Sequence, residues 1–490
     1  MAAAGARRGP SGRGDLTQGS IAPTLLKFAL PTLASSIVQS LNGTVNAIWV
    51  GRFLGESALA ATANANMVMF LSTSFVFGFG MASSILIGQA FGRRDMDSAR
   101  RIVGTATGAF VVLAFTVALA GWIFAPHILH VLGTPAGATP LALAYLRVIF
   151  IAMPPALLMI SWMMALRGGG DALTPLWFMI LAVVLDSGLN PVFILGFGPV
   201  PRMGISGAAT ATVIANCISV VGLLVYVYWR DLPLRLRGRE LAYLLPNGAI
   251  LKTIVAKGLP MGIQMIVISV SALALVGMVN REGVDTTAAF GVAMQLWTYV
   301  QMPAMALGAA VSAMAAQNIG AGKWDRVSKI TRVGIVQALL ITGSLIVILT
   351  LADRSVMALF MGGGSPALPI ARHIHVLATW NFLLFGVMMV LIATVRANGA
   401  VWAPLIILAV GLVPVRFGWI FLTYKWLGAD ALWTSFPVSA ALNLAMAVAY
   451  YLNGSWKKAH MRVEELPCED ECIEGAEATR EPGGALNPAG

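Results

Sequence analysis

Long apolar stretches, separated by short breaks that contain Gly, Pro or Arg, fill most of this sequence. A helix needs about 20 predominantly apolar residues to cross a bilayer, and twelve stretches reach that length. They are residues 24–50, 57–87, 102–126, 140–166, 174–197, 205–229, 251–280, 286–316, 329–352, 370–395, 401–423 and 431–452. We therefore expect an all-α integral membrane protein with twelve transmembrane helices.

Composition supports lipid as the solvent. Of the 490 residues, 58% are hydrophobic and only 11% are charged, which leaves too little polar surface to cover a water-soluble core. The first residues are basic and rich in Gly and Pro, without the apolar run of a signal peptide, and predict a disordered cytoplasmic tail over 1–20. The end of the chain holds eight of the 21 acidic residues and predicts a second, acidic cytoplasmic tail over 456–490.

The distribution of Lys and Arg predicts the orientation. Of the 32 basic residues, 24 lie in the two tails or in the loops on the side of those tails. By the positive-inside rule both termini are cytoplasmic, in a bacterial-type inner membrane that the chain crosses many times. The net charge of +11 then reflects topology and contact with anionic lipids, and we expect no nucleic-acid partner.

An internal repeat organises the chain. At an offset of 228 to 229 residues, Pro31 pairs with Pro260, and the loop sequence GQAFGRRD pairs with AQNIGAGKWD. Further along, LRGGGDALTP pairs with VRANGAVWAP. The repeat predicts an N-lobe over 21–232, a cytoplasmic linker over 233–250 and a C-lobe over 251–455.

Six spans per half is an even number, so the two halves enter the membrane in the same sense. They are then parallel repeats, related by an axis along the membrane normal, as in many secondary transporters. Such a molecule has a cleft between its lobes, and rocking of one lobe against the other opens that cleft to either side. A duplicated channel would need a filter loop, and the sequence contains no recognisable one.

Asp186 is the acidic residue that falls in the middle of a predicted span. A charge at the bilayer centre costs from about 2.5 to more than 10 kcal/mol, so such a residue is a functional candidate. Asn190 follows one helical turn later and precedes Pro191, and the first span carries Asn42 and Asn46. These residues predict a cation-coupling site, in which Asp186 takes up a proton or its oxygens hold Na⁺. The alternative is structural: a paired Asp, with amides that bond helices together.

Other polar and aromatic residues in the spans predict a substrate cleft that also depends on adaptable Met side chains. These candidates are Gln39, Trp49, Gln264, Gln295, Trp297, Tyr299, Trp380 and Asn381. Trp and Met are equally common as packing or lipid-facing residues. Arg416 lies in the middle of the eleventh span, where it can snorkel, pair with an amide or meet an anion.

Metal sites are not predicted. His373 and His375 have no third ligand nearby, and Cys468 and Cys472 lack a histidine that would complete a zinc set. We expect no cofactor, with H⁺ or Na⁺ as the coupling ion. Small organic substrates and membrane lipids are the expected partners of a monomer.

Taken together, these motifs resemble those of the multidrug and toxic compound extrusion (MATE) family over residues 20–455. The resemblance rests on PTLASSIVQSLNGTVNAIWVGRFLG, GQAFGRRD, LRGGGDALTP, LNPVFILGFG and AAQNIGAGKWD. It implies two six-helix lobes that form a V, and export of organic compounds by antiport with a cation, without ATP.

The match departs from the family pattern at the acids. One branch has an acidic residue where this chain has Asn46, and Asp before Pro where it has Asn190. Relative to that branch, this chain has the acid at Asp186 and the amide at Asn190, one helical turn later, instead of the reverse. The hypothesis of a coupling site therefore rests on Asp186. Another branch has acids in spans 7 and 10, where this chain has Ile268 and Phe385.

Three other functions fit the sequence less well. A flippase for lipid-linked sugars needs a basic cavity for pyrophosphate, and the spans offer Arg416 and Arg147. A membrane enzyme needs a cluster of acids, histidines or metal ligands, which a single mid-span Asp does not supply, so we do not expect an enzyme. Major facilitators share the twelve parallel spans but order Gly, Asp and Arg differently in the loop between spans 2 and 3.

Overall fold

A computed structural model describes residues 14–131, 139–196, 201–362, 364–459 and 461, without the side chains of 56–57, 59–61, 63–68, 70–72 and 359. The described secondary structure is helical throughout. The first half contains α1 (Ile21–Leu54), α2 (Glu56–Arg93), α3 (Met96–Val131), α4 (Thr139–Gly168), α5 (Leu173–Leu195) and α6 (Ile205–Trp229). The second half contains α7 (Gly248–Val279), α8 (Val284–Gly320), α9 (Trp324–Leu351), α10 (Asp353–Met361), α11 (Ala367–Ala378), α12 (Asn381–Ala397), α13 (Trp402–Val410), α14 (Arg416–Leu427) and α15 (Asp430–Asn453). Short turns η1 (Gly238–Leu244), η2 (Asn280–Glu282) and η4 (Ser455–Lys458) join or follow them.

The twelve predicted spans are confirmed within the described residues. Eleven helices are long and apolar enough to cross a membrane, and α11 with α12 passes the same test as a twelfth, broken span. The prediction of one helix over 370–395 was wrong in detail, because α11 and α12 meet at an angle of 44°. At this bend the side-chain amide of Asn381 donates to the carbonyl of Ala378 over 2.6 Å, which competes with regular helical bonding.

The eleventh span is also irregular. Between α13 and α14 the chain makes a π turn, η3 (Gly411–Val415), that contains Pro414. Proline has no N–H to donate, and a π turn includes one residue more than an α turn. The segment from α13 through the π turn to α14 therefore contains one residue more than the matching part of α5.

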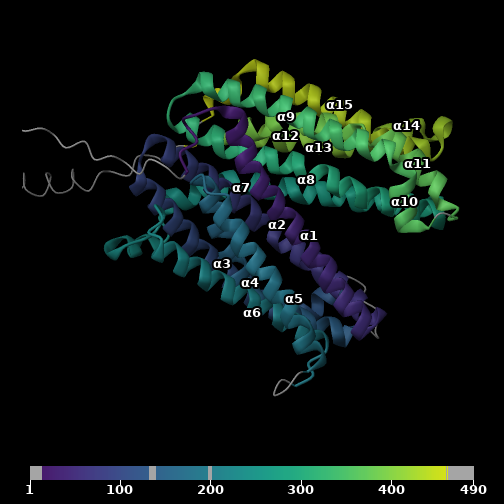
Figure 1. The fold of residues 1–490 in the computed structure, drawn as a ribbon, viewed down its shortest axis with the longest axis horizontal. Coiled ribbons are helices and arrows are strands. Elements are labelled where there is room, and N and C mark those ends of the chain that lie inside the picture. Colours follow the sequence, from purple (N-terminus) through teal and green to yellow (C-terminus); the bar gives the residue numbers. More distant parts are fainter. Residues whose placement is uncertain (1–13, 132–138, 197–200, 363, 460, 462–490) are drawn as a thin grey trace, which may run out of the picture.

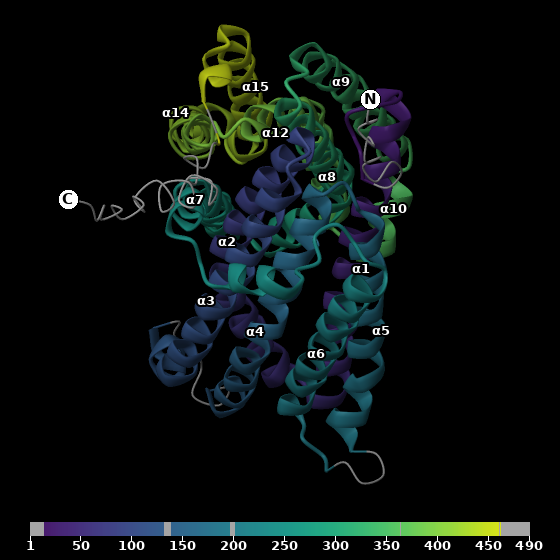
Figure 2. The same ribbon diagram turned by 90° about the vertical axis from the view of Figure 1, so that its left-hand side faces the viewer.

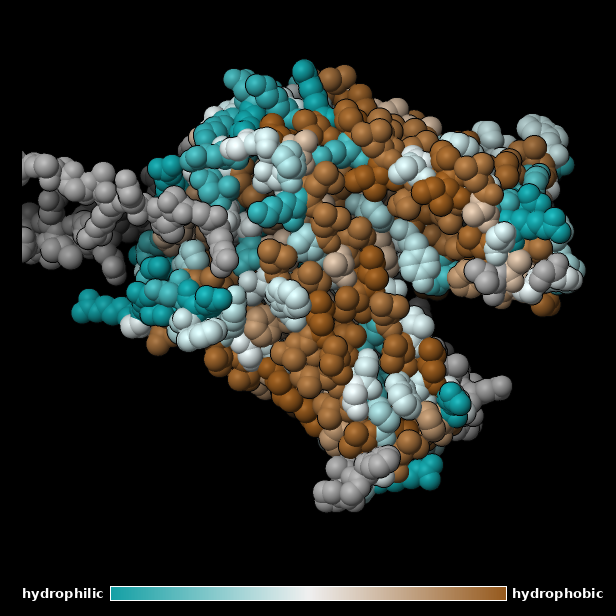
Figure 3. Space-filling view, viewed as in Figure 1, coloured by the Kyte–Doolittle hydropathy of each residue, from teal (hydrophilic) through white to brown (hydrophobic). Residues whose placement is uncertain are grey.

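The helices form two lobes arranged as a V (Figure 1). We call the closed end the base; it holds the α2–α3 turn, residues 94–95, and the α8–α9 turn, residues 321–323. The opposite, open end is the mouth, where the space-filling view shows a hollow between the lobes (Figure 3). An apolar band covers the middle of both lobes on that face, and hydrophilic residues gather at the two ends (Figure 3).

The first helix of each half crosses to the other lobe at the base, as the view from that end shows (Figure 2). Leu25 and Phe28 of α1 pack in one apolar cluster with Leu307 and Val311 of α8. In the matching place Ile254 of α7 packs in the main cluster of the N-lobe. The two lobes thus share their cores at the base, and separating them there exposes buried apolar surface.

Two hydrogen bonds related by the repeat join the lobes at the base. The side chain of Gln89 donates to the carbonyl of Ala397 over 2.7 Å, and that of Gln317 donates to the carbonyl of Gly168 over 3.3 Å. Gln317 follows Gln89 by 228 residues and Ala397 follows Gly168 by 229, so the contacts are equivalent. The predicted repeat is therefore visible as symmetry in the closed end of the molecule.

Residues Gly14–Gly19 form a strap over the same end of the molecule. Leu16 N–H donates to the Gln317 carboxamide over 2.9 Å, and Arg326 donates to the carbonyls of Gln18 and Gly19. Although burial disfavours the charged form of Asp15, hydrogen bonds from Thr17 and the charge of Lys323 hold its pKa below the ordinary value. This part of the predicted N-terminal tail is thus bound to the C-lobe, whereas 1–13 and most of the C-terminal tail, with Cys468 and Cys472, lie outside the described residues.

Close packing of α2 on α8 gives a test of the closed base. A Cβ atom on Gly320 would lie 2.1 Å from the backbone oxygen of Gln89, so Gly320→Ala forces the two helices apart. We expect Gly320→Ala to lengthen the distance between spin labels on Ser98 and Ser328, at the bases of the two lobes. Double electron–electron resonance on protein with its native cysteines replaced by serine measures this distance.

Gly277→Ala is the matched control, because a Cβ atom on Gly277 meets no heavy atom within 4 Å. An unchanged distance distribution in Gly320→Ala would show that the base tolerates the added methyl group and would contradict this packing.

Candidate functional site

Asp186 lies inside the N-lobe, on α5, with 3% of its surface exposed. The hydroxyl of Thr212 on α6 donates to its carboxylate over 2.9 Å. No ion pair involves Asp186 within the described residues. A buried carboxylate without a basic partner is costly, so the surrounding polar groups must provide its compensation.

Amides from two helices supply polar groups around this carboxylate. Asn42 on α1 interacts with the Asp186 carboxylate. Asn190 is fully buried, and its side chain donates to the backbone carbonyl of Asp186 over 2.9 Å. Asn46 interacts with the hydroxyl of Tyr145, a buried residue of α4 that is itself within electrostatic range of Asp186. The structure thus brings all four predicted coupling residues into one neighbourhood.

Three buried side-chain oxygens on these asparagines accept no hydrogen bond within the described residues. They are the side-chain oxygens of Asn42, Asn46 and Asn190. Unpaired buried oxygens cost free energy unless a donor or a cation satisfies them. A carboxylate with several amide oxygens is the type of ligand set that hard cations prefer. The site therefore has the chemistry to hold a small cation, or a proton on Asp186.

Tyr145 and Thr212 also belong to this neighbourhood and were not predicted from the sequence. Tyr145 is a polar-tipped aromatic residue in a predicted span that also contains Arg147, which is a weak signal. Thr212 has no signal in the sequence, because it is one of two threonines in α6 and its role depends on which face of α6 meets Asp186.

The other N-lobe candidates lie outside this cluster. Gln39 is exposed, and Trp49 is half-buried with its ring stacked on Phe53, 5.2 Å between ring centroids. Both are on α1, the helix that also carries Asn42 and Asn46. Contact of Gln39 and Trp49 with a substrate stays a prediction.

The C-lobe candidates divide between exposed and buried positions. Gln295 and Tyr299 on α8 are exposed and hydrogen-bonded to each other over 3.2 Å. Trp380, at the bend between α11 and α12, is 48% exposed. Gln264 and Asn381 are buried. Of these five, the exposed three are accessible to a solute without rearrangement.

Trp297 is only 3% exposed and belongs to an aromatic cluster inside the C-lobe. Its indole N–H donates to the hydroxyl of Thr379 over 2.9 Å, and its ring lies 4.9 Å from that of Phe436. His375 also bonds Thr379, while His373 contacts Asp430. The two histidines therefore have separate partners, and they do not share a ligand position.

Arg416 begins α14, directly after the π turn, and is half-buried. Its guanidinium carbon lies 4.5 Å from the centroid of the Phe436 ring, and one terminal nitrogen donates to Ser439 over 3.2 Å. Its Nε is buried without a partner. Arg416 thus provides the C-lobe with a cation next to its aromatic cluster.

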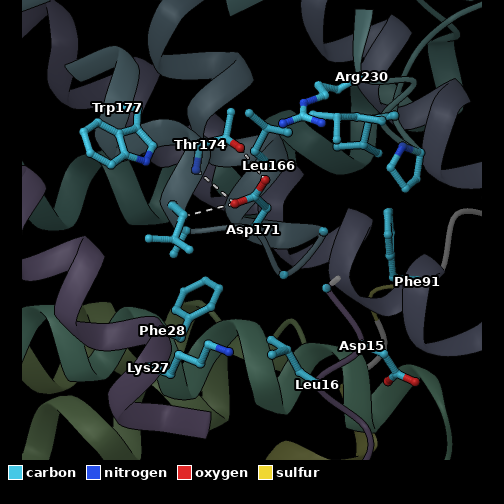
Figure 4. A pocket seen from close by; sticks show the side chains of 18 of the residues that line it. Asp15, Leu16, Lys27, Phe28, Phe91, Leu166, Asp171, Thr174, Trp177 and Arg230 are labelled. Carbon is cyan, nitrogen blue, oxygen red and sulfur yellow. Dashed lines mark hydrogen bonds between the residues drawn. The ribbon is translucent and has the colours of Figure 1, made fainter. Parts of the chain in front are cut away.

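A separate cavity of about 730 Å³ lies at the base of the N-lobe. The strap, α1 and the α4–α5 turn form part of its wall, with Lys27, Asp171 and Arg230 among the lining side chains (Figure 4). The Asp171 carboxylate accepts hydrogen bonds from Leu173, Thr174 and the Thr174 hydroxyl, so it caps the start of α5. None of the predicted site residues lines this cavity.

Comparison with known proteins identifies relatives over most of the chain. A family model described as MatE matches twice, at residues 31–192 and 260–421. Probable multidrug resistance protein YoeA of Bacillus subtilis (strain 168) is 37% identical over 433 residues, 88% of this chain and 93% of that protein. Probable multidrug resistance protein YpnP of the same strain is 29% identical over 459 residues, 92% and 99% of the two chains.

A solved structure has the same fold. It is described as the outward-facing conformation of a multidrug resistance MATE family transporter of the MOP superfamily. It superposes with a TM-score of 0.81 at 21% identity, over 91% of this chain and 98% of that one.

The unpaired oxygens around Asp186 predict stabilisation by a small cation. We expect Na⁺ in place of choline at pH 8 to raise the thermal unfolding midpoint by several degrees, since a ligand that binds only the folded state stabilises it. Asn190→Ala removes one of these oxygens and is expected to abolish most of that increase.

Asn443→Ala is the matched control, because Asn443 is also a buried amide with an unpaired oxygen but lies on α15, in the other lobe. Loss of the Na⁺ effect in both variants, or its absence from the unmodified protein, would contradict a cation site at Asp186.

Proposed function

Because this chain belongs to the MatE family, we propose that it exports organic compounds across the membrane in exchange for Na⁺ bound at Asp186. The observation that carries the coupling proposal is one buried carboxylate beside three asparagines whose buried side-chain oxygens accept no hydrogen bond within the described residues. A proton on Asp186 would satisfy one of these oxygens, whereas a bound Na⁺ can be shared by several. This favours Na⁺ over H⁺ as the coupling ion.

The orientation follows from the charge distribution. Arg93 and Arg94 end α2, and Lys323 and Arg326 flank the start of α9, so the base is rich in cations. By the positive-inside rule the base faces the cytoplasm and the mouth faces outward, in a bacterial-type inner membrane. The V-shaped arrangement is then the outward-open state, the one that releases cargo outside.

α1 provides a physical link between ion and cleft. Its first turns pack in the C-lobe cluster with α8, and its later turns carry Asn42 and Asn46 to the Asp186 site. A cation at Asp186 attracts these amide oxygens and so favours one position of α1. Since the same helix participates in the closed base, ion occupancy biases which end of the molecule is open.

The cargo is proposed to bind between the lobes. The two relatives named above are probable multidrug resistance proteins, and the exposed Gln295, Tyr299 and Trp380 offer an aromatic and polar surface. Aromatic surfaces bind varied apolar compounds without demanding one shape. The proposal is therefore an exporter of amphipathic organic compounds.

The decisive change is Asp186→Asn, which removes the charge while keeping the size of the side chain. We expect it to abolish Na⁺-driven export, because an amide has no charge to hold Na⁺. The measurement is transport of a fluorescent amphipathic dye in vesicles, with either a sodium or a proton gradient imposed.

Asp285→Asn is the control, since Asp285 is an exposed acid in the first turn of α8. Export that continues in Asp186→Asn would overturn the site, and export driven by a proton gradient alone would overturn the choice of Na⁺.

A further inference from the structure

The repeat assigns a counterpart to each element of the Asp186 site. In the second half, α13, the π turn and α14 correspond to α5, and α15 corresponds to α6. Pro404 follows Pro175 by 229 residues in this alignment (404 − 175 = 229). The extra residue of the π turn raises the offset by one, to 230, for residues that follow it. At that offset the counterpart of Asp186 is Arg416 (416 − 186 = 230).

The backbone gives an independent register for α6 and α15. Gly204, before α6, has φ 58° and ψ −130°, and Gly428, in the turn before α15, has φ 55° and ψ −134°. These values are favourable only for glycine and are nearly the same, so the two residues are equivalent and the offset here is 224 (428 − 204 = 224). Phe436 is then the counterpart of Thr212 (436 − 212 = 224).

The contacts agree with both registers. In the N-lobe the Thr212 hydroxyl donates to Asp186, and in the C-lobe Arg416 lies over the Phe436 ring. The same pair of positions therefore makes the same helix-to-helix contact in each lobe. The chemistry is reversed, because an acid with a hydroxyl partner is replaced by a base with an aromatic partner.

Arg416 has donors left over for a ligand. A guanidinium carries five N–H groups, and the hydrogen bond to Ser439 uses one of them. Its Nε is buried and unpaired, and no carboxylate pairs with Arg416 among the described side chains. Burying an unpaired arginine within a membrane-spanning segment costs free energy, so such a residue is a candidate for binding rather than for packing.

The surroundings of Arg416 suit an amphipathic molecule. Phe436 packs against Trp297 and Phe290, so one side of the guanidinium borders an aromatic cluster. α7 packs along α13 and contacts the π turn, and Glu282, in the short turn after α7, accepts a hydrogen bond from Tyr424 of α14 over 2.6 Å. Arg416 itself is half-buried and retains exposed surface.

We propose that Arg416 binds the anionic group of an organic substrate, a carboxylate, sulfonate or phosphate ester, with the apolar body of that substrate against the Phe436 aromatic cluster. This proposal rests on the proposed function, in that it names a substrate class for the exporter. The two lobes then bind opposite charges at equivalent positions: the N-lobe holds the coupling cation and the C-lobe holds the anionic part of the cargo.

Two xanthene dyes of opposite charge, carboxyfluorescein and rhodamine 123, test the proposal by equilibrium binding. Fluorescence polarisation with the full chain in lipid nanodiscs measures the affinity for each dye without any ion gradient. We expect Arg416→Gln to weaken carboxyfluorescein binding about tenfold or more, the range for a lost hydrogen bond to a charged group, and rhodamine 123 binding less than about twofold. Arg416→Lys keeps the charge and is expected to restore part of the affinity for the anion.

Arg147→Gln is the matched control. Arg147 is another arginine within a span, with its guanidinium 4.9 Å from the Trp122 ring and its Nε also buried and unpaired, but it lies on α4. Absence of carboxyfluorescein binding in the unmodified protein, equal weakening of both dyes, or the same loss in Arg147→Gln would overturn the proposal.

The proposed coupling is tested separately. Export that does not depend on sodium, together with anion binding that requires Arg416, would contradict the coupling proposal and leave this site standing.

Discussion

The shared packing of the two lobes at the base is the constraint on which the other features depend. The first helix of each half packs in the core of the other lobe. At the same end, the side chains of Gln89 and Gln317 each donate a hydrogen bond to a backbone carbonyl of the other lobe. Since these contacts join the lobes at the base, the lobes diverge toward the mouth, and the space-filling view shows a hollow between them there (Figure 3). The strap adds polar contacts to the same end, so opening the base requires breaking apolar packing and hydrogen bonds together.

Duplication of the fold did not preserve the chemistry of the interior. Loops, glycine turns and inter-lobe contacts are equivalent in the two halves, because both lobes must meet at the same base. The buried polar positions are under no such constraint. Asp186 with its amides in one lobe and Arg416 with its aromatic neighbours in the other show how equivalent helix contacts accept opposite charges. An internal repeat therefore provides two pockets that can diverge while the movement of the lobes is retained.

Much of the site was predictable. Asp186 was identified because an acid in the middle of an apolar span is costly, and Asn190 because it lies one turn away on the same helix face. Thr212 and Tyr145 were not identified, because their importance comes from which face of α4 or α6 meets α5. The bend before Asn381 and the π turn at Gly411–Val415 were also missed, since hydropathy records how apolar a stretch is and not how its backbone bonds are arranged.

From the sequence alone came the number of spans, the duplication, the parallel sense of the halves and the candidate acid. These are local or periodic properties, which depend on the energy of transferring side chains into lipid and on similarity between the halves. Only the tertiary structure decided that α1 and α7 exchange lobes at the base and that three amide oxygens near Asp186 are left unpaired. It also showed that Arg416 occupies the position in the second half that is equivalent to Asp186 in the first half. Those features depend on contacts between helices far apart in the chain, and such contacts are set by the packing of the whole molecule.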